Sequence, residues 1–136
     1  MTLPEAEQWI AAAGAAWTEE TAARWAVDLG GQLAGRMTLK FHLGDACAGA
    51  GYWTRQADRG RGVAPQALLA ATRWAFGQGF HRVQLEHSVQ NQASCRVAAK
   101  AQFSEEGIRR SAALHADGWH DMHLHGRINN APPATT

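Results

Sequence analysis

One stretch of regular alternation constrains the fold of this chain more than any other feature. Within Leu33–Leu43, the odd-numbered positions from Met37 onward are apolar, and the even-numbered positions between them are charged or polar. A repeat of two places successive side chains on opposite faces of a β-strand, one buried and one facing water. We therefore expect a strand here, within a sheet that is covered on one face.

Two further strands are predicted beside this one. Ala23–Leu29 has apolar residues at alternate positions, and Cys47–Thr54 has the length and apolar character of a buried strand. Short turn-forming segments, Gly30–Gln32 and Gly44–Asp45, separate the three runs. Such short connections join antiparallel neighbours, so the sequence predicts an antiparallel meander.

The second half of the chain changes to alternating helices and strands. The periodicity predicts, in order, a helix over Ala64–Phe76, a strand over His81–His87, a helix from Asn91, and a hairpin of Phe103–Ala113 and Trp119–Ile128. An N-terminal helix is expected over residues 4–17, where Pro4 suits the first turn. The predicted fold class is α/β (α+β), with a mixed, mostly antiparallel sheet flanked by helices.

Length and composition indicate one globular domain and exclude several function classes. The 136 residues suffice for a single core, which we place in residues 1–128, with a disordered tail over 129–136. A formal charge of +1 gives no field for nucleic acid or an anionic membrane. No long apolar run or signal peptide is present, and the two cysteines form no disulfide framework, so we expect a cytoplasmic protein.

The segment Arg59–Ala64 carries the clearest chemistry. It lies between a predicted strand and a predicted helix, and its glycines allow the backbone N–H groups to point toward one spot. The start of the helix adds unsatisfied donors and the positive end of a dipole, and Arg59 and Arg61 can add charge. Anion binding and a plain tight turn with solvated arginines are both compatible with this segment alone.

The ordered motifs of the chain resemble those of the GNAT superfamily of N-acetyltransferases, in particular its ribosomal-protein alanine N-acetyltransferase-like branch. The matching motifs are Arg59-x-x-Gly62-x-Ala64 for the pyrophosphate signature, Gly51-Tyr52-Trp53 at a strand end, Asn91-x-x-Ser94, Phe103-x-x-Glu106-Gly107, and Asp121. The resemblance covers roughly residues 4–128. Two departures are Gln102, where the family has glycine, and an apparent lack of the family's first strand and helix. A missing edge strand makes a homodimer reasonable.

The resemblance implies acetyl-CoA as cosubstrate and assigns most of the site. The backbone of Arg59–Ala64, Gly60 and Gly62 included, would hold the pyrophosphate through the N–H groups of Arg61, Gly62, Val63 and Ala64. The pantetheine would lie between splayed strands, against main-chain groups near Trp53 and Thr54. Asn91 would reach the pantetheine, and Ser94 would donate a proton to the departing thiolate. Without the resemblance, a helix cap is the simplest role for Asn91, and Ser94 is an ordinary first-turn serine.

The acceptor is expected to be a primary amine of low basicity. No carboxylate follows Asp45 in the third strand, which leaves Glu86 and His87 as candidate bases. An α-amine has a pKa of roughly 8 and a lysine amine roughly 10.4, so an α-amine needs far less help to lose its proton. We expect transfer to a peptide or protein N-terminus. The alternatives are a non-catalytic acyl-CoA-binding module and an acetyltransferase for a small amine such as an antibiotic.

Histidines near the C-terminal end prompt the question of a metal. His120, His123 and His125 lie close together, and His123 and His125 share a strand face. Their spacing is not that of a zinc motif, and no cysteine or helical histidine pair completes it. The sequence therefore predicts no metal site, and we expect the histidines to line a sheet face or an acceptor cleft.

Overall fold

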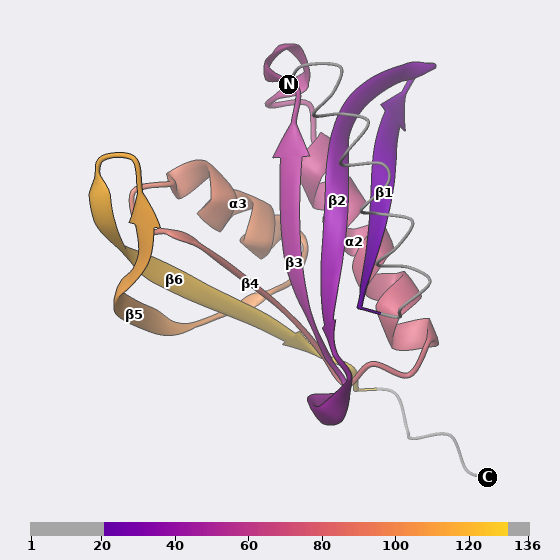
Figure 1. Cartoon of the computed structure of the whole chain (residues 1–136). Coiled ribbons are helices and arrows are strands. Elements are labelled where there is room, and N and C mark those ends of the chain that lie inside the picture. The colour runs from indigo at the N-terminus through magenta and orange to yellow at the C-terminus, as the bar shows by residue number, and fades with distance from the viewer. Residues whose placement is uncertain (1–20, 131–136) are drawn as a thin grey trace, which may run out of the picture.

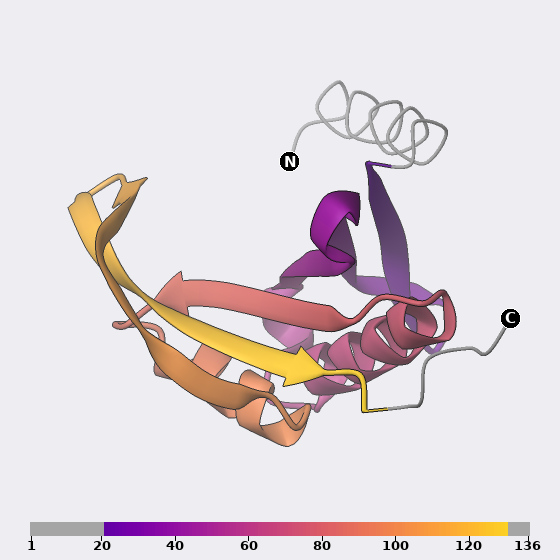
Figure 2. The same cartoon turned by 90° about the horizontal axis from the view of Figure 1, so that it is seen from below.

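Within residues 21–130, the chain forms a mixed sheet with helices α2 and α3 on one face (Figures 1 and 2). The computed structural model describes residues 21–130, so the helix expected over 4–17 and most of the predicted tail lie outside the described residues. The six strands are ordered β1-β2-β3-β4-β6-β5. Their bounds are β1 Ala22–Leu29, β2 Gln32–His42, β3 Cys47–Thr54, β4 Arg82–Ser88, β5 Ser104–His115 and β6 Gly118–Ile128, and the helices are α2 Val63–Gly77 and α3 Gln92–Lys100. The predicted fold class is confirmed.

The alternating segment forms β2 as predicted, with one correction at its end. Met37 and Leu39 are buried in the core, and Phe41 packs against it. Leu43, which we placed on the same face, is 58% exposed because the strand ends at His42 and the chain turns into a short 3₁₀ segment. The local turn therefore overrides the period-two pattern at its last position.

Helix α2 supplies most of the packing behind the sheet. Its side chains Leu68, Ala71, Thr72 and Ala75 are buried, and Trp74 meets Trp25 of β1 edge-on with ring centroids 5.2 Å apart. Removal of this apolar surface from water stabilises the layer by roughly 1.5–3 kcal/mol for each fully buried large side chain. Within residues 21–130, no helix is both long and apolar enough to cross a membrane.

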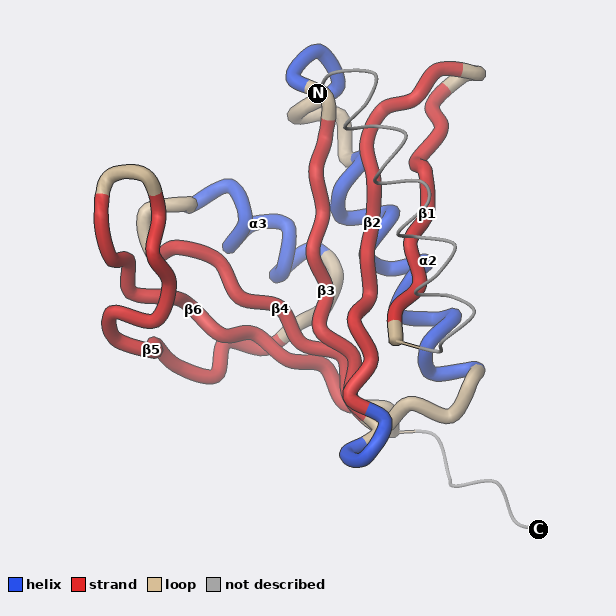
Figure 3. The backbone as a smooth tube through the Cα atoms, viewed as in Figure 1, coloured by secondary structure: helices blue, strands red, loops and turns tan. Residues whose placement is uncertain are grey.

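The sheet opens between β3 and β4, its one parallel pair. Pairing runs from Cys47 opposite Arg82 to Ala50 opposite Leu85 and then stops, although β3 continues to Thr54. Figure 3 shows β1–β3 and β4–β6 diverging from this short pairing as two halves of a splayed sheet. The backbone of Gly51–Thr54 consequently has no β4 partner, and a gap opens beside it.

The last hairpin and its neighbours close the other half of the sheet. β5 and β6 pair antiparallel around the predicted turn, and β6 also pairs with β4. Arg82 binds Glu106 with two hydrogen bonds across these strands. Asn129, which we assigned to the tail, donates its backbone N–H to the carbonyl of His81 and its side-chain amide to the carbonyls of Phe76 and Phe80.

Candidate functional site

A cavity of about 610 Å³ occupies the gap between β3 and β4. It brings together nearly all residues that the sequence analysis assigned to the site. Those that line it are Trp53, Thr54, Arg59, Gly60, Gly62, Val63, Ala64, Glu86, His87, Asn91 and Ser94. The loop before α2 lies at one end and the start of α3 borders another side, so segments that are distant in the sequence face one space.

The loop before α2 has the backbone shape of an anion cradle. Gly60 and Gly62 have φ values of +78° and +77°, a left-handed conformation that side chains disfavour. Gly62 is the N-cap of α2, and because glycine has no side chain, none caps the first turn. The N–H groups at this helix start are therefore available to a ligand, and the dipole favours a negative one.

Asp58 braces this loop, a role that the sequence analysis missed. Asp58 is 3% exposed, and its carboxylate accepts hydrogen bonds from Arg55 Nε at 2.7 Å and from Arg61 at 3.2 Å. The Arg55 hydrogen bond is the main cause that lowers the pKa of Asp58. The Arg61 side chain thus binds Asp58 rather than lining the cavity, so only its backbone is positioned for the role we predicted. The spacing Arg55-x-x-Asp58-x-x-Arg61 in the sequence is the feature that could have indicated this pairing.

Arg59 remains beside the cavity and is the remaining cationic side chain of the loop. Its Nε donates to the carbonyl oxygen of Thr54 at 3.2 Å, which ties the loop to the end of β3. The side chain lines the cavity as well. Arg59 can therefore add charge to an anion held by the loop while it fixes the end of the strand.

At the start of α3, two polar residues form the predicted pair and a third joins them. Asn91 caps the helix, since its Oδ1 accepts from the backbone N–H of Ser94 at 3.1 Å. Ser94 is 8% exposed, and its Oγ accepts a hydrogen bond from the Tyr52 hydroxyl at 2.8 Å. Because Tyr52 donates, the hydroxyl hydrogen of Ser94 is free to point elsewhere. Burial raises the pKa of Tyr52, which keeps it a donor near neutral pH.

Glu86 borders the main cavity and a second hollow of about 580 Å³. Its carboxylate accepts a hydrogen bond from Arg109 at 2.6 Å, so it is engaged in an ion pair. Among the described residues, this hollow is lined by four Lys or Arg side chains, namely Arg24, Arg36, Lys40 and Arg109, and by one carboxylate. The electrostatic character of the hollow is therefore cationic.

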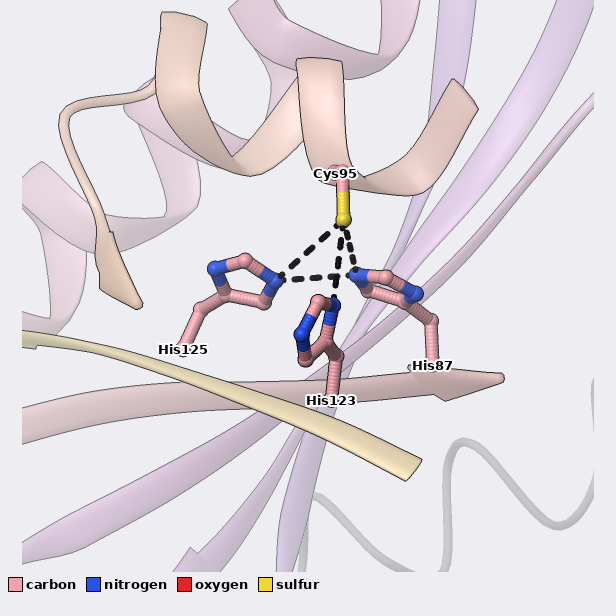
Figure 4. A group of neighbouring side chains, drawn as sticks. All are labelled: His87, Cys95, His123 and His125. Carbon is pink, nitrogen blue, oxygen red and sulfur yellow. Dashed lines mark hydrogen bonds between the residues drawn. The ribbon is translucent and has the colours of Figure 1, made fainter. Parts of the chain in front are cut away.

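The arrangement of the histidines differs from the one that the sequence predicts. His123 and His125 share a face of the sheet as predicted, but they converge there with His87 of β4 and with Cys95 of α3 (Figure 4). Our expectation that no cysteine completes the group is wrong, because the fold brings Cys95 next to His123, which lies 28 residues away in the sequence. Burial, and then the neighbouring His87 and His123, lowers the pKa of His125, so its imidazole is neutral at pH 7.

Comparison with known proteins gives one family and a consistent set of folds. Residues 1–104 match the family described as acetyltransferase (GNAT) domain. A search of curated proteins finds no match. The RimL ribosomal L7/L12 α-N-protein acetyltransferase, solved with coenzyme A, superposes with a TM-score of 0.91 at 23% identity, covering 97% of this chain and 76% of its own.

Two further solved structures show the same arrangement. The acetyltransferase of Salmonella typhimurium that modifies the N-terminal serine of L7/L12 has a TM-score of 0.87 at 23% identity, covering 94% of this chain and 76% of its own. The microcin C7 self-immunity acetyltransferase MccE, in complex with acetyl-CoA and AMP, has a TM-score of 0.89 at 18% identity. The match covers 94% of the present chain and 72% of MccE. At these identities the likeness establishes a shared fold.

Proposed function

The chain belongs to the GNAT acetyltransferase family, and we propose that it transfers the acetyl group of acetyl-CoA to the α-amine of a protein or peptide N-terminus. One observation carries this proposal. A single cavity at the opening between β3 and β4 combines an anion-binding loop before α2 with a hydroxyl donor, Ser94, on α3. An acyl-CoA needs such a combination, since its pyrophosphate and its thioester are distant parts of one molecule.

Acetyl-CoA fits the cavity in one direction. The pyrophosphate would accept hydrogen bonds from the N–H groups of Arg61, Gly62, Val63 and Ala64, and Arg59 would add charge. The pantetheine amides would pair with the backbone of Trp53 and Thr54, which no β4 residue pairs. The thioester would then lie near Ser94, with Asn91 fixing the turn that presents it.

The reaction is a direct acyl transfer. The neutral amine attacks the thioester carbonyl carbon, a C–N bond forms, and the C–S bond breaks as the tetrahedral intermediate collapses. The amine gives up one proton to a base, and the departing thiolate takes one from Ser94, whose hydroxyl regains a proton from water. Tyr52 positions Ser94, because its donated hydrogen bond leaves the serine hydrogen for the sulfur. This general acid can contribute about 10²-fold or more.

The cationic hollow beside Glu86 supports an α-amine acceptor. Positive charge near a bound amine lowers its pKa and favours the neutral, reactive form. The same charge repels a polycation, which argues against polyamines, and attracts acidic residues that follow an N-terminus. Glu86 is the candidate to receive the amine proton, and this requires that its ion pair with Arg109 loosen when the acceptor binds.

The test is an acetylation assay with matched acceptors. We would incubate the protein with acetyl-CoA and peptides that differ in one respect: a free α-amine with no lysine, a blocked α-amine with lysine, and a free α-amine followed by acidic or by basic residues. Release of the CoA thiol and peptide mass would be followed together. We expect transfer to free α-amines, fastest before acidic residues.

Three results would contradict the proposal in different ways. Faster transfer to lysine would overturn the acceptor class, and transfer to a small amine alone would favour an enzyme of the antibiotic-modifying kind. Binding of acetyl-CoA with no thiol release for any acceptor would favour the non-catalytic module. The variant Gly62→Asp serves as the control for background hydrolysis.

A homodimer and a cytoplasmic location stay predictions from the sequence. Ile108, Leu114 and Trp119 on the outer hairpin are 56%, 66% and 64% exposed, which favours a partner against that hairpin. Light scattering of the purified chain measures the mass directly.

A further inference from the structure

Four side chains converge between α3 and the sheet, on the face away from the cationic hollow. Three are histidines, His87 of β4 and His123 and His125 of β6, and the fourth is Cys95 of α3. His87 is 7% exposed and His125 is 4% exposed, while Cys95 and His123 are half-buried, so the group lies largely inside the protein. Figure 4 shows the thiol pointing down from the helix and the three rings pointing up from the strands.

We propose that these four residues bind one zinc ion that fastens α3 to the sheet. Cys95 Sγ lies 3.3 Å from His123 Nδ1, 3.4 Å from His87 Nε2 and 3.9 Å from His125 Nε2, and the two Nε2 atoms are 2.9 Å apart. Tetrahedral zinc, with bonds of about 2.0 Å to nitrogen and 2.3 Å to sulfur, separates its ligand atoms by roughly 3.3–3.6 Å. These four separations need shifts of only a few tenths of an ångström, and all four ligand atoms lie within 4.8 Å of one another.

Outer hydrogen bonds fix the tautomers that a metal requires for two of the three histidines. His87 Nδ1 donates to the carbonyl oxygen of Ser88 at 2.8 Å, which leaves its Nε2 lone pair facing the centre. His123 Nε2 donates to the Glu105 carboxylate at 2.7 Å, which leaves its Nδ1 lone pair facing the centre. Metal-bound histidines regularly donate their second N–H to a carbonyl or carboxylate in this way.

The charges also balance. Zn²⁺ with the thiolate of Cys95 carries one net positive charge, and the Glu105 carboxylate behind His123 offsets it. Without a cation, the four ligand atoms that face the centre would be held together by hydrogen bonds alone, with the Cys95 thiol and one imidazole N–H as the donors. That hydrogen-bonded cluster is the alternative which the experiment must distinguish.

Four protein ligands make this a closed, structural type of site. Helix α3 has nine residues and buries only Ser94 and Ala98, so its own packing is slight. A metal bond from Cys95 would therefore fix the helix whose preceding residue, Ser94, lines the cavity. The proposal does not depend on acetyl transfer, which requires no metal, but it would exclude His87 as the catalytic base.

The experiment uses the full chain, purified without a histidine tag, freed of metal with EDTA and titrated with Zn²⁺ or Co²⁺. Bound metal is counted by mass spectrometry after desalting, and Co²⁺ reports its ligands through its visible spectrum and a thiolate charge-transfer band. The ligand variants are Cys95→Ser and His123→Gln. The matched controls are Cys47→Ser, which removes the other thiol, and His120→Gln, which removes a ligand from the second group, His115, Asp117 and His120.

We expect one equivalent of zinc, a tetrahedral Co²⁺ spectrum with a thiolate band, and a Tm higher by roughly 10 °C at about 100 times Kd. Cys95→Ser should abolish the thiolate band, and each ligand variant should raise Kd by more than about 100-fold, while both controls leave it unchanged. Glu105→Gln should weaken binding by about 10–100-fold. A wild-type chain that binds no stoichiometric zinc, or binding that persists in both ligand variants, would overturn the proposal.

Discussion

Replacing Gly62 with aspartate should weaken acetyl-CoA binding while leaving the fold largely intact. A Cβ at this position would meet only the Gln66 side chain, at 3.6 Å, which is an ordinary contact. The cost to folding is therefore the left-handed backbone, about 1 kcal/mol for a residue with a side chain. A carboxylate near a helix start recovers about 0.3–1 kcal/mol through the dipole.

The cost to binding is larger because it is electrostatic. A carboxylate about 5 Å from one phosphate charge opposes it by about 1 kcal/mol in a water-like dielectric and by about 3 kcal/mol near a protein surface. These energies correspond to a rise in Kd of about 5-fold to 150-fold for each phosphate charge. Gly62→Ala is the matched control, since it has the same backbone strain and no charge.

Titration calorimetry with acetyl-CoA, at low and high salt, separates the two effects. We expect Gly62→Ala to bind within a few-fold of the wild type and Gly62→Asp to bind at least about tenfold more weakly than Gly62→Ala, with the difference shrinking as salt screens the charge. Thermal unfolding should show similar Tm values for both variants. If Gly62→Asp binds acetyl-CoA as tightly as Gly62→Ala, the pyrophosphate is not at this loop.

Three other predictions follow from single side chains. Ser94→Ala should lower kcat about 10²-fold and leave Kd for acetyl-CoA within a few-fold, and an unchanged kcat would remove Ser94 as the acid. Tyr52 is the one tyrosine of the chain, and burial raises its pKa, so its phenolate absorbance should titrate above pH 10 in the folded protein and near pH 10 in the denatured protein. The contribution of Tyr52 to stability is therefore present below pH 10 and is lost as the pH rises above the pKa of the folded state. An apparent pKa at or below 10 in the folded protein would contradict this. Gln102 has φ +69° and follows Ala101, the C-cap of α3, so Gln102→Gly should increase the free energy of unfolding by about 0.5–1 kcal/mol in denaturant titrations. A loss of stability would show that the side chain contributes more than its strain costs.

The regular elements could be predicted because their causes are local. The alternation around Met37 and Leu39 and the helical spacing around Leu68 express burial of one face, and the boundaries agree with the structure to within one or two residues. The Gly60 and Gly62 turn was also readable, since glycine is the residue that a left-handed backbone favours. Leu43 was misplaced because a 3₁₀ segment, not the strand period, determines its direction.

The parts that could not be predicted depend on contacts across the fold. Nothing in the sequence places Tyr52 against Ser94, which are 42 residues apart and meet because β3 and α3 border one cavity. The group around Cys95 was missed for the same reason, since its ligands come from two strands and a helix and form no short motif. Asp58 shows that charge patterns are ambiguous, because the sequence alone does not distinguish an Arg61 that binds this carboxylate from one that faces a phosphate.

The central claim is that acetyl-CoA occupies the opening between β3 and β4 with its pyrophosphate at the start of α2. Electron density from crystals grown with CoA tests it most directly. We predict phosphate density within hydrogen-bond distance of the N–H groups of Gly62, Val63 and Ala64, and pantetheine density running along Trp53 and Thr54 toward Ser94. Density for CoA on another surface, with this cavity filled by water alone, would contradict it.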